Sequence, residues 1–276
     1  MKAKKSYGQH FLTSDAISER IAKSLLQTAQ YEQRVLEVGP GKGMLTKQLL
    51  AAGYDLTCVE ADRDMIDYLK TNYTEALENR LVAADFMKVN LTDLMGEAQF
   101  AIIGNYPYNI SSQIIFKAID YREQVVELVG MFQKEMADRV VAPHGNKTYG
   151  VISVLTQAYF ECKYLFTVHK GSFNPPPKVE SAVIRLTRRS NLDLGCDPKL
   201  FKTIVKLGFG QRRKMLRNTM RSLVGNNEEL LENPVFDLRA EQLSVQDFKS
   251  LTNLIAPYRI GLAELQADSD DFDEED

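Results

Sequence analysis

The sequence predicts an α/β fold built on an open, mainly parallel sheet, followed by a small C-terminal domain made only of helices. Short apolar runs that suit buried strands alternate with amphipathic segments through the N-terminal two thirds of the chain. The first run leads into a glycine-rich turn, and after a polar stretch at 190–197 the pattern becomes helical. We therefore expect one domain at 1–190, a helical domain at 191–262 and an acidic, disordered tail at 263–276.

Other elements follow from local patterns. Ser14 or Asp15 can cap a helix that runs to about Gln27. Apolar and β-branched runs predict strands at 127–132 and 162–168, and a further strand after the three prolines at 175–177. Helical spacing predicts helices at 112–119, 133–139, from 147 onward, 198–208, 211–223 and 247–255, the last capped by Ser244.

The composition is that of an ordinary globular protein, with 44% hydrophobic and 26% charged residues. No apolar run reaches the roughly 18 residues that a membrane span needs, and residues 6–10 are polar where a signal peptide would be hydrophobic. Cys58, Cys162 and Cys196 lie far apart, which argues against disulfides and against a zinc site. We expect a cytoplasmic monomer that binds neither metal nor membrane.

Charge is distributed unevenly along the chain. The formal net charge is −3, but residues 268–276 contain seven acids and no base, and without them the balance is +4. Between residues 198 and 227 there is no acid, and a polyanion is the partner that such a segment predicts. Its basic residues are Lys199, Lys202, Lys206, Arg212, Arg213, Lys214, Arg217 and Arg221.

The first predicted strand, at 35–38, runs into a turn with glycines at 39, 41 and 43, and a helix then extends to about residue 52. This arrangement is typical of a nucleotide-binding βα turn. It departs from the dinucleotide fingerprint, because Met44 occupies the place of the third fingerprint glycine. No Gly-Lys-Ser/Thr occurs, which excludes a P-loop, and Glu37 suits a cationic ligand better than a pyrophosphate.

Acidic residues follow the next two strands. The strand at 55–59 ends at Glu60, at a distance from the glycines where an acid meets ribose hydroxyls. The strand at 81–84 ends at Asp85, which can accept a hydrogen bond from an adenine amine. Because parallel strands present their carboxyl ends at one edge of the sheet, Glu37 and these two acids predict an anionic pocket.

The fourth strand ends at Asn-Tyr-Pro-Tyr, residues 105–108. Pro107 pushes Tyr106 into an extended conformation, so the Tyr106 carbonyl has no helical partner. Asn105 adds a second acceptor and Tyr108 an aromatic face, which together can hold the amine of a flat heterocycle such as adenine. Taken alone, the pattern is more typical of an ordinary loop.

The order of these features resembles that of the class I S-adenosylmethionine-dependent methyltransferases, which have a Rossmann-like sheet. The resemblance implies that Glu37 and the glycines face the methionine and sulfonium side, Glu60 the ribose, and Asp85 and Phe86 the adenine. Residues 105–108 occupy the place of the Asn/Asp-Pro-Pro-Tyr-like motif of amino-methyltransferases.

Three further segments look like those of the ribosomal RNA adenine dimethyltransferases: Gly-Gln-His-Phe-Leu at 8–12, the proline-rich segment 173–184, and Gln-Arg-Arg-Lys at 211–214, the last resembling the KsgA-type small-subunit enzymes. The resemblance implies transfer of methyl groups from S-adenosylmethionine to N6 of two adjacent adenosines in the 3′-terminal hairpin loop of 16S rRNA, leaving S-adenosylhomocysteine, with a role in subunit maturation. Alternatives are a 23S rRNA adenine methylase of the antibiotic-resistance type, and a non-catalytic ribosome-assembly or transcription factor on the same scaffold.

The resemblance also implies the site residues. The catalytic residues are Asn105, Tyr106, Tyr108 and Phe173, the last as a second aromatic ring opposite Tyr108. The cofactor residues are His10, Leu12, Glu37, Gly39, Gly41, Glu60, Ala61, Asp85, Phe86 and Asn105. The residues that contact rRNA are Lys2, Lys4, Lys5, Lys199, Lys202, Lys206, Arg212, Arg213, Lys214, Arg217 and Arg221. His10 replaces the Asn that is common in this arm of the family.

Overall fold

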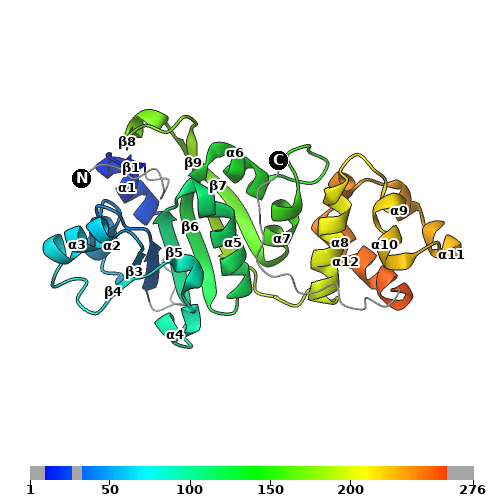
Figure 1. Cartoon of the computed structure of the whole chain (residues 1–276), viewed down its shortest axis with the longest axis horizontal. Helices are drawn as coiled ribbons and strands as arrows, with labels where there is room; N and C mark the ends of the chain where they lie inside the picture. The colour runs from blue at the N-terminus through cyan, green and yellow to red at the C-terminus, as the bar shows by residue number, and fades with distance from the viewer. Residues whose placement is uncertain (1–9, 27–32, 260–276) are drawn as a thin grey trace. The chain divides into compact units, whose positions relative to one another are not determined.

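The computed structural model describes residues 10–26 and 33–259 (Figure 1). Its described residues form two compact units. The N-terminal unit contains the residues up to 141 and residues 159–189, and the C-terminal unit contains residues 142–158 and those from 190 onward. The segment 142–158 thus groups with the helical unit, although the sequence predicts a single boundary near residue 190. Lys2, Lys4, Lys5, Gln27 and the tail at 263–276 lie outside the described residues.

The N-terminal unit is built on a seven-stranded sheet. In spatial order, its strands are β4 (Leu81–Ala83), β3 (Asp55–Glu60), β2 (Arg34–Val38), β5 (Phe100–Asn105), β6 (Val125–Gln133), β9 (Ser181–Arg188) and β7 (Phe160–Val168). The first five strands are parallel, whereas β9 pairs antiparallel with both β6 and β7. Chain order reverses between β2 and β5, and open α/β sheets bind ligands at the carboxyl ends of the strands at such a switch point.

Helices connect the strands of this sheet. They are α1 (Asp15–Ala22), α2 (Thr46–Ala51), α3 (Arg63–Asn72), α4 (Leu91–Met95), α5 (Ser111–Asp120) and α6 (Lys134–Val141). The predicted cap of the first helix is confirmed, because the Ser14 side chain accepts a hydrogen bond from the Ile17 N–H, 3.4 Å away. That helix ends at Ala22, earlier than predicted.

A second, two-stranded sheet joins segments far apart in sequence. Strand β1 (Phe11–Leu12) pairs antiparallel with β8 (Phe173–Asn174), and Leu12 is opposite Phe173. Both of these residues are buried in the hydrophobic core that also contains strands β2, β5 and β6. The arm and the proline-rich segment are therefore neighbours.

The C-terminal unit is helical. Its helices are α7 (Val151–Tyr159, whose last residue belongs to the N-terminal unit), α8 (Pro198–Gly210), α9 (Leu216–Thr219), α10 (Arg221–Val224), α11 (Glu228–Leu231) and α12 (Val245–Ile255). The predicted Ser244 cap of α12 is confirmed: the Ser244 Oγ accepts a hydrogen bond from the Asp247 N–H at 3.1 Å.

The continuous helix predicted over 211–223 is wrong. The chain leaves helical conformation at Gln211, and the Leu216 N–H donates a 2.8 Å hydrogen bond to the distant Leu238 carbonyl instead of to a helical partner. Leu216, Met220 and Leu223 are nevertheless buried. The periodic apolar positions therefore do face the core, but along two short helices instead of one. Across the described ranges, no helix is long and apolar enough to cross a membrane.

Candidate active site

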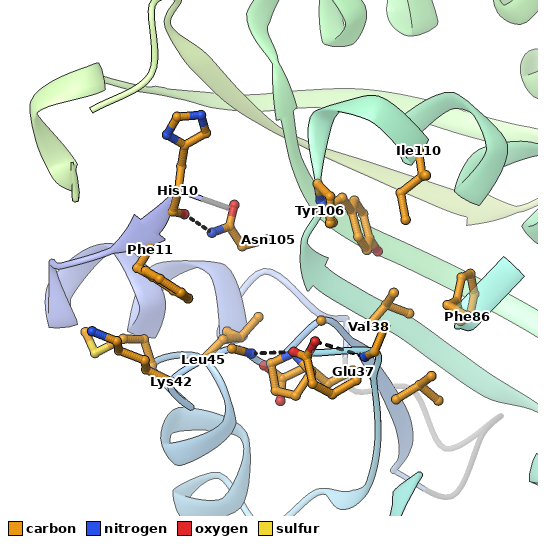
Figure 2. A pocket seen from close by; sticks show the side chains of 18 of the residues that line it. His10, Phe11, Glu37, Val38, Lys42, Leu45, Phe86, Asn105, Tyr106 and Ile110 are labelled. Atoms are coloured by element: carbon orange, nitrogen blue, oxygen red, sulfur yellow. Dashed lines mark hydrogen bonds between the residues drawn. The ribbon is translucent and has the colours of Figure 1, made fainter. Parts of the chain in front are cut away.

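A cavity of about 630 Å³ lies at the carboxyl ends of β2, β3, β4 and β5, a size that suits a nucleoside-sized ligand (Figure 2). It lies wholly within the N-terminal unit. Each residue assigned above to the cofactor lines it: His10, Leu12, Glu37, Gly39, Gly41, Glu60, Ala61, Asp85, Phe86 and Asn105. Phe11, Lys42 and Ile110 also line it and were missed, because nothing in their local sequence points to a ligand.

The glycine turn is left-handed at three positions. Gly39, Gly41 and Gly43 have φ of +68°, +55° and +75°, a region that side-chain-bearing residues rarely adopt. At Gly43 space also excludes a side chain, because a Cβ there would lie 2.6 Å from the ring of Tyr73. At Gly41 a Cβ would lie 3.2 Å from the ring of Phe11, so the arm packs directly on this turn.

Glu60 is held by backbone donors. Its Oε1 accepts hydrogen bonds from the N–H groups of Ala61 and Asp62, both at 2.9 Å, and its Oε2 accepts from the Gly41 N–H at 3.0 Å. Burial raises the pKa of Glu60, and these donors oppose that rise. A carboxylate has about four acceptor sites, and these three donors leave roughly one, which can accept a hydrogen bond from a ribose hydroxyl.

Glu37 lies in an apolar environment and is 2% exposed. Its Oε2 accepts hydrogen bonds from the Thr46 hydroxyl at 2.7 Å and from the Cys58 thiol at 3.6 Å. Burial, with a smaller contribution from Glu60, raises the pKa of Glu37 to about 7. A cation in the cavity would favour its ionised form. Cys58 is buried and is opposite Glu37 in the β2–β3 register, a pairing that the sequence does not reveal.

Asp85 and Phe86 follow β4 in a short turn. The Asp85 Oδ1 accepts a 3.0 Å hydrogen bond from the Met87 N–H and so caps the 3₁₀ turn Phe86–Lys88. Phe86 is buried and its ring borders the cavity (Figure 2). The arrangement offers a flat apolar ring beside an exposed carboxylate, which suits an aminopurine.

The side chain of Asn105 has a defined orientation. Its Nδ2 donates a 3.0 Å hydrogen bond to the main-chain carbonyl of His10, drawn as a dashed line in Figure 2. Because a carbonyl oxygen can only accept, the amide nitrogen must face the arm, and the amide oxygen is the end left to accept other donors. The arm therefore determines which end of the amide serves as acceptor.

Tyr106 is an anchor for this turn. It is 1% exposed, its hydroxyl donates a 3.2 Å hydrogen bond to the Val129 carbonyl, and its ring packs beside Phe132. Gly104 and Gly130, paired across β5 and β6, make room for the ring, since a Cβ on Gly130 would lie 1.9 Å from it. Tyr106 can thus contribute its backbone to the site, whereas its ring is buried in the core.

Of the two aromatic residues expected to face each other, only Tyr108 is among the residues that line the cavity. Tyr108 lines the cavity, half-buried, with its hydroxyl 2.7 Å from the Ser181 Oγ. Phe173 is 4% exposed, because its strand pairs with β1 and buries the ring in the core. The ring beside Tyr108 belongs instead to His10, with centroids 5.5 Å apart and planes tilted by 30°. His10 is fixed in turn by a 2.9 Å hydrogen bond between its Nδ1 and the Pro175 carbonyl.

The basic residues of the C-terminal unit fall into two groups. Arg212 donates to the Glu241 carboxylate and to the Tyr149 carbonyl, both at 2.9 Å, and Arg217 is paired with Asp237. These two arginines therefore also connect elements within the unit, and their contact with rRNA stays a prediction. The exposed members are Lys199, Lys202, Lys206, Arg213, Lys214 and Arg221. Among the described residues there is no cluster of three or more potential metal ligands.

Comparison with known proteins gives consistent results. Residues 1–256 match the family model described as ribosomal RNA adenine dimethylase. The protein named ribosomal RNA small subunit methyltransferase A of Parabacteroides distasonis is 52% identical over 91% of this chain and 93% of its own length. The protein of the same name from Cytophaga hutchinsonii is 49% identical over 93% of this chain and 98% of its own length.

Solved structures share the fold. A dimethyladenosine transferase from Plasmodium falciparum matches with a TM-score of 0.76 and 24% identity, over 90% of this chain and 98% of that one. The 23S rRNA methyltransferase ErmE matches with a TM-score of 0.63 and 24% identity, over 88% of this chain and 99% of that one. The predicted class I methyltransferase fold is thereby confirmed, and the chain belongs to the ribosomal RNA adenine dimethylase family.

Proposed function

We propose that this protein transfers methyl groups from S-adenosylmethionine to N6 of two adjacent adenosines in the 3′-terminal hairpin loop of 16S rRNA. One observation carries the proposal: an amide whose oxygen is set as the acceptor, that of Asn105, borders a cavity lined by three carboxyl residues. Family membership and the names of its relatives support the substrate.

The residues present fit the methyl donor. Glu60 has acceptor capacity for the ribose, Asp85 and Phe86 suit the adenine, and the buried Glu37 suits the cationic end. When bound, this donor supplies an electrophilic methyl group on a positively charged sulfur. The negative carboxylates attract that charge before reaction and lose this attraction when the neutral product forms.

The chain's own part in the reaction is to hold and orient the target amine. The lone pair of an adenine amine is delocalised into the ring, so the amine is a poor nucleophile. The Asn105 Oδ1 and the Tyr106 carbonyl would accept its two hydrogens, which favours a pyramidal nitrogen aimed at the methyl group. Tyr108 would stack on the flipped-out base. No strong base is required, because the amine becomes acidic once alkylated and its proton can then leave to water.

A second methylation requires the same site to accept a modified amine. After the first transfer only one N–H remains, so one acceptor loses its partner and the pocket must admit a methyl group. Exposed lysines and arginines of the C-terminal unit would hold rRNA phosphates, with binding that weakens steeply as salt rises. The roles of Lys2, Lys4 and Lys5, the cytoplasmic location and the monomeric state stay predictions.

The test is mass spectrometry of rRNA fragments after purified protein, S-adenosylmethionine and unmethylated 30S subunits are incubated together. We expect two adjacent dimethyladenosines near the 3′ end of 16S rRNA. Parallel reactions with 50S subunits address the resistance-type alternative, which predicts modified 23S rRNA instead. Unmodified rRNA in both reactions, from protein that binds subunits, would support the non-catalytic alternative.

A further inference from the structure

Lys117 is a buried lysine on α5 to which the proposed reaction assigns no role. The residue is 7% exposed. Its ammonium donates hydrogen bonds to three main-chain carbonyls, those of Phe86 at 2.6 Å, Met87 at 3.1 Å and Val89 at 2.6 Å. An ammonium has three donors, so all of them are used on the 3₁₀ turn Phe86–Lys88 and the residue that follows it.

Burying this charge is costly, and burial lowers the pKa of Lys117, while Asp85 and Asp120 oppose that effect. If α5 only packed on the sheet, an apolar side chain of similar length at position 117 would avoid the cost of burying a charge. The hydrogen bonds between the ammonium and the three carbonyls offset the free-energy cost of burying the charge. A role for Lys117 therefore depends on what this turn does.

The turn held by Lys117 carries the adenine side of the cavity. Asp85 and Phe86 both line it, and the lysine Nζ lies 4.8 Å from the centroid of the Phe86 ring. The Phe86 carbonyl accepts a 3.3 Å hydrogen bond from the Val89 N–H within this turn, and Lys117 supplies further donors to three carbonyls in and just after it. Without the ammonium, the Met87 and Val89 carbonyls would lose this donor, and water or a different backbone conformation would have to replace it.

The same helix also contacts the turn that holds the target amine. Helix α5 begins directly after residues Tyr108–Ile110, and the Ser111 hydroxyl at its start donates a 3.0 Å hydrogen bond to the Tyr108 carbonyl. Lys117 lies six residues further along, about 9 Å at 1.5 Å per residue. One rigid element therefore connects both sides of the cavity.

We propose that Lys117 is a positioning residue that holds the Asp85–Phe86 turn in the geometry that recognises the adenine of the methyl donor. This inference rests on the proposed function, because it assumes that the cavity binds an adenosyl group. It deepens that proposal, since adenine selectivity then depends on a residue that does not itself line the cavity.

The experiment is calorimetric titration of two ligands, S-adenosylhomocysteine and its hypoxanthine analogue S-inosylhomocysteine, which lacks the amine. We expect the wild-type protein to prefer the adenine form. Lys117→Met should weaken S-adenosylhomocysteine binding by about tenfold, the equivalent of one lost polar contact. The ratio of the two affinities, for S-adenosylhomocysteine over S-inosylhomocysteine, should then fall close to one. Lys88→Met, the same change at an exposed position on the same turn, should match wild type, and Lys117→Arg should restore part of the preference.

The outcomes separate the two proposals. A wild-type protein that binds neither ligand contradicts the proposed function. A wild-type protein that prefers adenine, with a folded Lys117→Met variant of unchanged preference, overturns the role of Lys117. If that variant does not fold, amide hydrogen exchange of the wild-type protein tests whether Lys117 holds the turn. Slow exchange of the amides at 87–89 without ligand supports the role, and fast exchange that slows only when S-adenosylhomocysteine is added overturns it.

Discussion

In the cavity of the N-terminal unit the carboxyl groups of Glu37 and Glu60 are buried and hydrogen-bonded, whereas in the C-terminal unit Lys199, Lys202 and Lys214 extend into solvent. The buried acids act at fixed positions, with pKa values altered by their surroundings. The exposed bases act through their number and are screened by salt. We therefore expect single substitutions to have large, specific effects in the cavity and small, additive effects on the basic surface.

The largest effect is expected for Asn105→Ala. Loss of the amide oxygen removes an acceptor that positions the amine, so methyl transfer should fall by about 10²-fold or more, the scale seen when one preorganised catalytic hydrogen-bonding group is removed. Affinity for S-adenosylhomocysteine should change by no more than about threefold. A radiolabelled-methyl assay and calorimetry measure the two quantities. Asn72→Ala, at an exposed helix end, is the matched control, and near-normal turnover of Asn105→Ala would contradict the assigned role.

Glu37→Gln should change how stability depends on pH. The folded-state pKa of Glu37 is raised from 4.5 to about 7, so its contribution is fully present below about pH 4.5 and is lost as the pH rises through 7. Across that window the wild-type protein should lose about 3 kcal/mol of unfolding free energy relative to Glu37→Gln. Urea titrations of both proteins at pH 5 and pH 8 measure the difference, and parallel pH profiles would show that Glu37 ionises normally.

Arg212→Ala should destabilise the C-terminal unit by about 1 kcal/mol, a value kept small because the pair with Glu241 is partly exposed. The same change at the neighbouring exposed Arg213 should leave stability unchanged. Urea unfolding of the two variants compares them directly. Equal stabilities would mean that the Arg212 contacts contribute nothing and that this arginine belongs with the exposed set.

Lys214→Ala should have the smallest effect, a few-fold loss of affinity for rRNA that is uniform across sequences. If Lys214 neutralises one phosphate, the slope of log affinity against log salt should fall by about one. Filter binding of a 16S fragment between 50 and 200 mM salt provides the slope. A sequence-selective loss with an unchanged slope would place Lys214 in base recognition rather than in phosphate binding.

Much of the sheet and the cavity could be predicted from sequence, because strand ends and glycine turns are encoded within a few residues. Glu60 and Asp85 line the cavity as their positions after consecutive strands predict. What local patterns do not encode is long-range pairing. Phe173 is buried because its strand pairs with the arm 161 residues earlier in the chain, and the helix over 211–223 breaks where Leu216 bonds to Leu238.

Arg212 illustrates the same limit on the basic surface. Its neighbours in sequence suggest a phosphate contact, but its partner Glu241 is 29 residues away. Similarly, in the sequence Lys117 is only one lysine on an amphipathic helix. The structure shows that its ammonium binds the Phe86 carbonyl. Residue type and spacing predict where a site lies, whereas the assignment of individual charges to ligand or scaffold requires their three-dimensional partners.

The hydrogen bond between Asn105 and His10 has an evolutionary consequence. Its acceptor is a main-chain oxygen, which every amino acid possesses, so no replacement at position 10 deletes the acceptor itself. The side chain at position 10 can therefore differ without loss of the orientation of the Asn105 amide. Only insertions, deletions or changes that displace the strand Phe11–Leu12 would break the hydrogen bond between Asn105 and the carbonyl at position 10. We therefore expect natural sequences to vary in the residue at this position but not in the length of the arm.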